Sequence, residues 1–258
     1  MGEVVAAEAT FASEAGPIEG FVARPADAGR HPAIILLSGI GGMLPQYRVV
    51  AEQFAAEGIV GVGLDWMMRE KDPPDQVVMQ DVDACARYLV QQDYVDAGQL
   101  VLSGYCRGGT LALLGLGQLP HFSAGVIFHG GPFYVRDRPS PFDMSVEKRP
   151  VEPYELAERY SMPLMFLHGG SDTVVPLEQM NQFLARLNDL GKEYEYKLYA
   201  ATGHAFTLYG EAQGRWWHAA HAEDAFREAV FFMRRVYNLP LGTVAPLVPG
   251  ARPEPARA

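Results

Sequence analysis

The chain has 258 residues, of which 48% are hydrophobic and 20% charged, and its formal net charge at pH 7 is -10. This length and composition indicate one globular domain with a substantial core, and no linker divides the chain. The acidic balance disfavours nucleic acid and anionic membrane surfaces as partners, and no apolar run is long enough to span a bilayer, so we expect a freely soluble protein that acts on a small molecule.

Short runs rich in β-forming residues alternate with segments of helical periodicity. In chain order, the runs predict strands over 4–11, 18–23, 33–37, 59–64, 99–103, 124–128, 163–168 and 194–199. The periodic segments predict helices over 46–57, 75–92, 110–119, 177–190 and 219–237. Residues 133–160 carry prolines and charges without clear periodicity, which predicts an irregular, partly helical excursion and leaves open whether it is a lid. Residues 1–238 would form the domain, and 239–258 a Pro/Ala-rich, partly disordered tail.

Strands that alternate with helices indicate the α/β class, with a doubly wound, mostly parallel sheet flanked by helices. The continuous apolar run 33–37 fits a strand that is buried on both faces. In such sheets, ligands bind beyond the carboxyl ends of the strands. The residues with the clearest chemistry all follow a predicted strand, so we expect them at this edge.

Residues 104–109 read GYCRGG and have the G-x-nucleophile-x-G form of a nucleophile elbow, with Cys106 as the nucleophile. The turn from strand to helix is so tight that side chains flanking the nucleophile would collide, and it holds the nucleophile in a strained conformation. The dipole of the following helix favours a thiolate. The alternative is a small buried cysteine in a glycine-rich turn. The strand and helix on either side, and the partners downstream, favour the nucleophile.

Two partners follow in the order that such folds require, nucleophile, acid and histidine. Asp172 lies in a loop after the strand 163–168, and His204 follows the strand 194–199. Asp172 would fix the tautomer of His204, and His204 would take the Cys106 proton and donate it to the leaving group. Alone, Asp172 could simply cap a turn and His204 could be a solvated loop residue. Their conjunction with the elbow favours a triad.

An oxyanion hole needs two preorganised backbone N–H donors. One is the amide after the nucleophile, Arg107, and for the other we favour Ile40 in the glycine-rich loop 38–42. This loop has neither the lysine nor the glycine spacing of a phosphate-binding loop. Candidates for substrate contacts near the strand ends, with core packing as the alternative for the aromatic residues, are Arg69, Tyr105, Tyr134 and Phe206.

The remaining histidines and the second cysteine have simpler interpretations. His168 is expected to be structural at a strand end, and His129 to pack at a turn, with lining of the pocket as the alternative. Cys85 falls on the apolar stripe of its helix. No spaced set of ligands predicts a metal site. Because neither cysteine belongs to a C-x-x-C pair and the N-terminus makes a poor signal peptide, we expect a cytoplasmic protein.

In these motifs the sequence resembles the dienelactone hydrolase (carboxymethylenebutenolidase) family of the α/β-hydrolase superfamily. The G-Y-C-x-G-G elbow, the H-G-x-x-D-x-x-V-P acid loop and the G-H-x-F histidine loop all match, and the resemblance runs from 18 to 235. It implies Cys106 as nucleophile with Asp172 and His204, and Arg107 and Ile40 as oxyanion donors. The family attacks an enol-lactone, forms an acyl-enzyme on sulfur and releases it with water, without a cofactor.

The chain departs from the family at two positions. The family carries a glutamate that helps to generate the thiolate where this chain has Gly39. It also carries an arginine for the substrate carboxylate where this chain has Leu208. The sequence therefore supports the triad better than the dienelactone substrate. His204 and the helix N-terminus would do most of the activation, and Arg69 or Arg107 is a candidate for an anion contact.

The sequence thus predicts a hydrolase of a small ester or lactone that works through a Cys106 thioester. A broad carboxylesterase or thioesterase of the same fold is the first alternative. A non-catalytic, ligand-binding homologue is the second, and a redox-sensing Cys106 is a further one. We expect a monomer or a small homo-oligomer.

Overall fold

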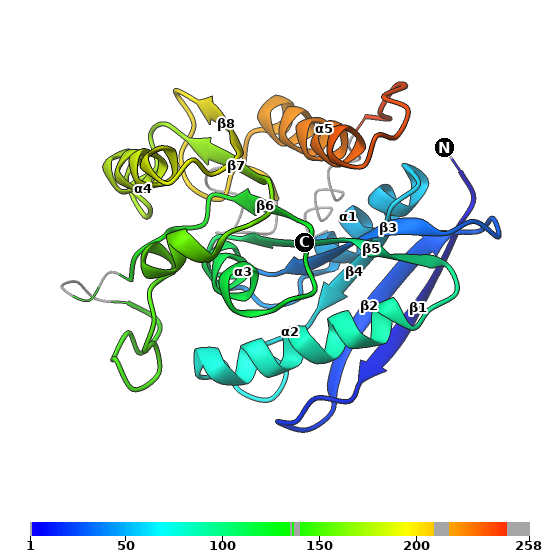
Figure 1. Cartoon of the computed structure of the whole chain (residues 1–258), viewed down its shortest axis with the longest axis horizontal. Helices are drawn as coiled ribbons and strands as arrows, with labels where there is room; N and C mark the ends of the chain where they lie inside the picture. The colour runs from blue at the N-terminus through cyan, green and yellow to red at the C-terminus, as the bar shows by residue number, and fades with distance from the viewer. Residues whose placement is uncertain (1, 135, 137–139, 209–216, 247–258) are drawn as a thin grey trace, which may run out of the picture.

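The computed structural model describes residues 2–134, 136, 140–208 and 217–246, and within them eight strands form one sheet in the order β1-β2-β4-β3-β5-β6-β7-β8 (Figure 1). The strands are β1 (Val4–Phe11), β2 (Ile18–Pro25), β3 (His31–Leu37), β4 (Val60–Leu64), β5 (Val95–Tyr105), β6 (Ala124–Phe128), β7 (Leu164–Gly169) and β8 (Tyr194–Tyr199). The pairs β1–β2 and β2–β4 are antiparallel, and all other pairs are parallel. The predicted mostly parallel sheet is therefore confirmed.

Helices cover both faces of the sheet. They are α1 (Pro45–Ala56), α2 (Asp75–Val90), α3 (Arg107–Gln118), α4 (Leu177–Asp189) and α5 (Ala219–Val236), with a short 3-10 helix at Pro153–Arg159. Apolar residues of α1 and α5 share one core cluster, and those of α2, α3 and α4 share the other. Figure 1 shows α5 and α2 on opposite sides of the sheet. Among the described helices, none combines the length and the apolar character that a membrane span needs.

The central strands are apolar because both of their faces are covered. In β3 every residue after His31 is buried, as the run 33–37 predicts, whereas most residues of the edge strand β1 are exposed. Burial of both faces leaves the carboxyl ends of β3, β5, β6, β7 and β8 as the place where loops can present polar groups.

The observed bounds differ from the predicted ones mainly around the elbow. Helix α3 begins at Arg107 instead of 110, and β5 runs from Val95 to Tyr105 instead of 99–103. Gly108 and Gly109 suggest a turn in the sequence, but they lie in the first turn of α3, packed against neighbouring backbone. The strand thus leads into the helix at Cys106 with no intervening loop.

Two irregular regions fall partly outside the described residues. Of the excursion 133–160, residues 135 and 137–139 lie outside, and the helical part is the 3-10 helix, which opens with a capping box between Glu152 and Glu155. Of the tail, residues 247–258 lie outside. The described part returns to the body, where the Ala245 amide donates to Glu57 Oε1 at 2.8 Å.

Candidate active site

Cys106 occupies the sharp turn between β5 and α3. Its backbone has φ 53° and ψ -118°, a region that residues other than glycine rarely adopt. The Cys106 amide donates to the Phe128 carbonyl at 3.0 Å and to His129 Nδ1 at 3.1 Å. The side chain is partly exposed, unlike Cys85, which is fully buried and whose thiol pKa burial raises. The predicted elbow is therefore present in the backbone.

The glycines of the elbow are required by close approaches of the backbone. A Cβ at Gly104 would lie 2.0 Å from the Gly108 carbonyl oxygen. A Cβ at Gly108 would lie 2.2 Å from the Leu37 carbonyl oxygen. The second contact shows that the start of α3 packs directly against the end of β3. This brings the elbow beside the loop 38–42.

His204 and Asp172 form a buried pair on the loops that follow β8 and β7. His204 Nδ1 lies 2.7 Å from Asp172 Oδ2. The other carboxylate oxygen, Oδ1, accepts the amides of Val174 and Val175 at 2.8 Å each. These bonds fix the carboxylate, which in turn orients the imidazole, as the sequence predicts for these two residues.

The charge of the site favours a protonated His204. Burial alone lowers the pKa of His204, but the charge of the Cys106 sulfur and its hydrogen bond to the ring, together with the Asp172 carboxylate, raise this pKa to about 10. The imidazole therefore holds its proton at neutral pH.

The loop 38–42 is anchored by two aromatic side chains. The Gly39 amide donates to the Tyr47 hydroxyl at 2.8 Å, and Trp66 Nε1 donates to the Ser38 carbonyl at 3.0 Å. Ile40 is exposed between these anchors and Gly42. The amides proposed for the oxyanion hole, Arg107 and Ile40, thus belong to the two backbone segments that pack against each other at the elbow.

Three of the residues predicted to contact substrate have structural partners instead. Tyr105 is 2% exposed and stacks on Phe128 with ring centroids 4.4 Å apart, and Phe206 is fully buried. The guanidinium of Arg69 pairs with Asp81 and with the carbonyls of Gly16 and Pro17, which fastens the β1–β2 turn to α2. These contacts hold the three side chains within the fold.

The two positions at which the chain departs from the family, Gly39 and Leu208, also have structural partners. Gly39 brings no carboxylate, and its amide is taken by Tyr47. Leu208 is buried in the core cluster of α1 and α5. Neither position supplies the charged group that the resemblance would place there.

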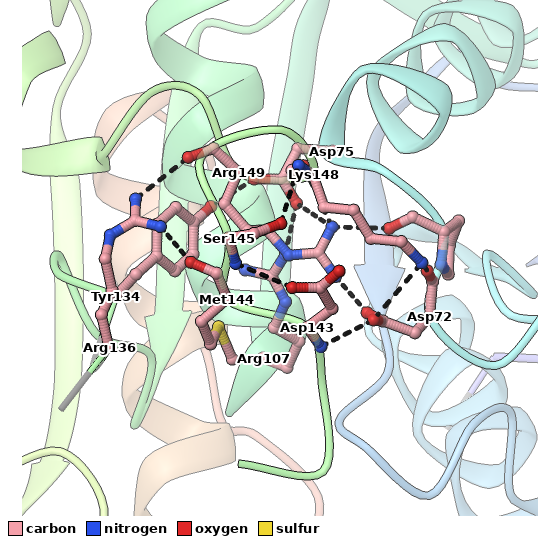
Figure 2. A network of polar contacts seen from close by, with 11 residues as sticks. Asp72, Asp75, Arg107, Tyr134, Arg136, Asp143, Met144, Ser145, Lys148 and Arg149 are labelled. Carbon is pink, nitrogen blue, oxygen red and sulfur yellow. Dashed lines mark hydrogen bonds and ion pairs between the residues drawn. The ribbon is translucent and has the colours of Figure 1, made fainter. Parts of the chain in front are cut away.

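Beside the elbow, two residues of the predicted site, Arg107 and Tyr134, belong to a buried polar network (Figure 2). Arg107 pairs with Asp75 Oδ1, Arg149 Nη1 lies 3.3 Å from the same oxygen, and the Tyr134 hydroxyl donates to Asp75 Oδ2 at 2.5 Å. Arg149, which is fully buried, also pairs with Asp72. The network joins the residue after the nucleophile to the start of α2 and to the excursion.

His129, predicted to pack at a turn with pocket lining as the alternative, directly contacts the elbow. It follows β6, is 1% exposed, and its ring lies 5.0 Å from the His204 ring between centroids. The other strand-end histidine, His168, has Nε2 3.0 Å from the Val175 carbonyl oxygen and 3.8 Å from Asp172 Oδ2. Among the described residues, no group of three or more metal-ligating side chains is gathered.

Comparisons with known proteins agree with this geometry. A family model described as the dienelactone hydrolase family matches residues 63–237. A protein of Bradyrhizobium sp, named a probable 2-oxo-3-(5-oxofuran-2-ylidene)propanoate lactonase, is 30% identical over 201 residues, which cover 72% of this chain and 77% of that protein. The carboxymethylenebutenolidase homolog of Mus musculus is 26% identical over 208 residues, 73% of this chain and 76% of that protein.

Solved structures share the fold. A crystal structure from Klebsiella pneumoniae subsp. pneumoniae has a TM-score of 0.79 at 22% identity and covers 90% of this chain and 99% of that one. Thermogutta terrifontis esterase 2 has a TM-score of 0.74 at 21% identity, with 93% and 96% covered. The fold is therefore the α/β-hydrolase fold, and the match of the family model over two thirds of the sequence shows that this chain is a hydrolase that belongs to the dienelactone hydrolase family.

Proposed function

We propose that this hydrolase cleaves a small ester or lactone with Cys106 as nucleophile, His204 as acid and base, and Asp172 as the group that orients His204. The observation that carries the proposal is the hydrogen bond of 2.7 Å between His204 and Asp172 beside a cysteine held at the elbow with a positive φ. The raised pKa of His204 supports it, because a thiolate–imidazolium pair is ready for attack.

The bonds and protons of each proposed step are all accounted for by Cys106, His204, the substrate and water. The Cys106 thiolate attacks the carbonyl carbon, and the amides of Arg107 and Ile40 stabilise the negative oxygen. The bond from carbon to the leaving oxygen then breaks, and His204 gives that oxygen its proton. In the second half, His204 takes a proton from water as the water attacks the thioester. The carbon–sulfur bond breaks, which restores the thiolate and the imidazolium.

A lactone is the favoured substrate class because the Bradyrhizobium relative is named for a lactone with a carboxylate. For an anionic group, Arg107 and Arg69 are both candidates. Arg69 is the more exposed, whereas Arg107 is buried and pairs with Asp75, and among the described residues its buried Nε and Nη1 atoms have no acceptor. The apolar Leu208 favours the alternative, a broad carboxylesterase or thioesterase that needs no anionic group. Matched lactones with and without a carboxylate separate the two, since only the first function prefers the carboxylate.

The test compares wild type, Cys106→Ala and Cys106→Ser on aryl acetates, simple lactones and cis-dienelactone. We expect Cys106→Ala to lose at least about a thousandfold in kcat/KM, since the nucleophile contributes most of the rate. Acid-quenched wild type should carry the acyl mass on the peptide containing Cys106. Equal turnover by wild type and Cys106→Ala would overturn the proposal.

A further inference from the structure

His129 lies where the segments that carry the three triad residues meet. Its backbone amide donates to the Leu167 carbonyl at 2.8 Å, on the strand that leads to Asp172. Its Nδ1 accepts the Cys106 amide at 3.1 Å. Its Nε2 lies 2.9 Å from the hydroxyl of Thr207, three residues after His204. One residue therefore bonds to the acid strand, the nucleophile elbow and the histidine loop.

These bonds define the state of the ring. Because Nδ1 accepts a hydrogen bond from the Cys106 amide, the ring proton of the neutral imidazole must sit on Nε2, where it can donate to the Thr207 hydroxyl. The neutral imidazole thus uses both nitrogens. A protonated ring would lose the bond to the elbow and would place a second cation 5.0 Å from the His204 ring. Burial, together with the charges of His204 and His168, lowers the pKa of His129 well below its usual value, which keeps the ring neutral.

The backbone of His129 is also unusual. It has φ 43°, a left-handed conformation that a side chain makes unfavourable. The residue that follows, Gly130, packs so closely on Gly109 in α3 that an added Cβ would lie 2.6 Å from that backbone. Strained backbone persists where the surroundings hold it firmly, and such positions concentrate at functional sites. The strain here turns the imidazole toward the elbow.

We propose that His129 is a positioning residue that fixes the Cys106 backbone relative to His204. It touches no substrate atom in this scheme and acts through the nucleophile. The inference rests on the proposed triad, because it assigns His129 the task of aligning two members of that triad. A shift of about 1 Å in such an alignment costs on the order of a hundredfold in rate.

The test uses variants that remove the bonds separately. His129→Leu removes both side-chain bonds, His129→Asn keeps an acceptor for the Cys106 amide, and Thr207→Val removes the second bond alone. Ile127→Ala, in β6 two residues before His129, serves as a control that lowers Tm without touching these bonds. The readouts are kcat and KM on an aryl acetate, the ultraviolet absorbance of the thiolate at neutral pH, and Tm.

We expect His129→Leu to lower kcat by about tenfold or more, with little change in KM and a weaker thiolate absorbance. His129→Asn should recover part of both signals, and Thr207→Val should lie between wild type and His129→Leu. Ile127→Ala should lose Tm but keep the thiolate absorbance. If His129→Leu fails to fold, the Asn and Val variants decide.

The inference about His129 and the proposed function are contradicted by different results. If Cys106→Ala is inactive while the folded His129 and Thr207 variants keep wild-type kcat and thiolate absorbance, His129 has no positioning role. If His129→Leu loses activity only in proportion to Tm, as Ile127→Ala does, the inference is equally wrong. If Cys106→Ala stays active, the proposed function itself fails.

Discussion

At the level of single residues, the site is marked by strained backbone. Cys106, His129 and Ala205 have φ values of 53°, 43° and 53°, and a non-glycine residue adopts such conformations at a cost of about 1–3 kcal/mol. Cys106 and Ala205 lie in segments of the proposed triad, and His129 follows β6 and accepts the Cys106 amide. Hydrogen bonds offset this cost, such as those that the Cys106 amide donates to the Phe128 carbonyl and to His129 Nδ1. The strained backbone therefore lowers the local stability, while these bonds keep the geometry of the site fixed.

The titration of His204 tests the electrostatic side of this geometry. Its pKa of about 10 balances burial, which lowers the value, against Cys106 and Asp172, which raise it. In Cys106→Ala the largest raising contribution is absent, so we expect the pKa of His204 to fall. The shift of its ring protons in NMR spectra against pH measures this, with His204→Gln to identify the signal. An unchanged titration would contradict a thiolate–imidazolium pair.

Sequence motifs reveal these residues unequally. Cys106, Asp172 and His204 each lie in a short motif directly after a strand, so local pattern and the topology of a parallel sheet suffice to find them. The partners of His129 lie 23 and 78 residues away, and no local pattern encodes such contacts. Tyr105 and Phe206 stand in the same motifs as the triad, but the face to which their side chains point depends on packing that the sequence does not reveal.

At the level of elements, the polar network fastens the excursion to the two helices beside the elbow. Arg149 of the excursion bonds to Asp72 and Asp75 at the start of α2, while Arg107 of α3 bonds to Asp75 (Figure 2). A segment held by buried ion pairs does not open freely, so the described part of the excursion is better interpreted as a fixed wall than as a lid. Its sequence, without periodicity, predicts the irregular path but not these bonds.

Removing Arg149 should therefore be costly. Arg149→Met leaves two carboxylates with one fewer partner in a buried setting, and we expect unfolding free energy to fall by about 3–5 kcal/mol. Arg186→Met is the matched control, since Arg186 pairs with Glu158 on an exposed surface and should cost less than about 1 kcal/mol. Urea denaturation measures both. Equal losses of unfolding free energy in the two variants would show that the network stabilises the fold no more than an exposed ion pair does.

At the level of the whole molecule, the sheet gathers distant segments at one edge. The turn after β5 and the loops after β7 and β8 carry Cys106, Asp172 and His204, and β3 and β5 lie beside each other in the centre. This arrangement follows from strand–helix alternation and right-handed crossovers, so the sequence predicts it well. The strand order in the sheet and the exact bounds of the elements depend on tertiary packing, so they are harder to predict from the sequence.

Central and edge strands should differ in local stability. Amides of β3 and of the buried half of β5 are enclosed on both faces, whereas β1 is an exposed edge. We expect hydrogen exchange to be slowest in β3 and β5, where it requires global unfolding, and fastest among these strands in β1. Mass spectrometry of peptides from the three strands measures this. Protection of β1 equal to that of β3 would contradict the expected gradient.

The unequal burial of the two cysteines has a practical consequence. Cys85 is sealed in the core and Cys106 is accessible, so in the folded chain a thiol reagent reports on one position. Under the proposed function, the number of reactive thiols in a native preparation equals the number of intact sites. Activity per titrated thiol is thus an internal standard for every variant that keeps Cys106, and a fluorophore or solid support attached there would occupy the proposed centre.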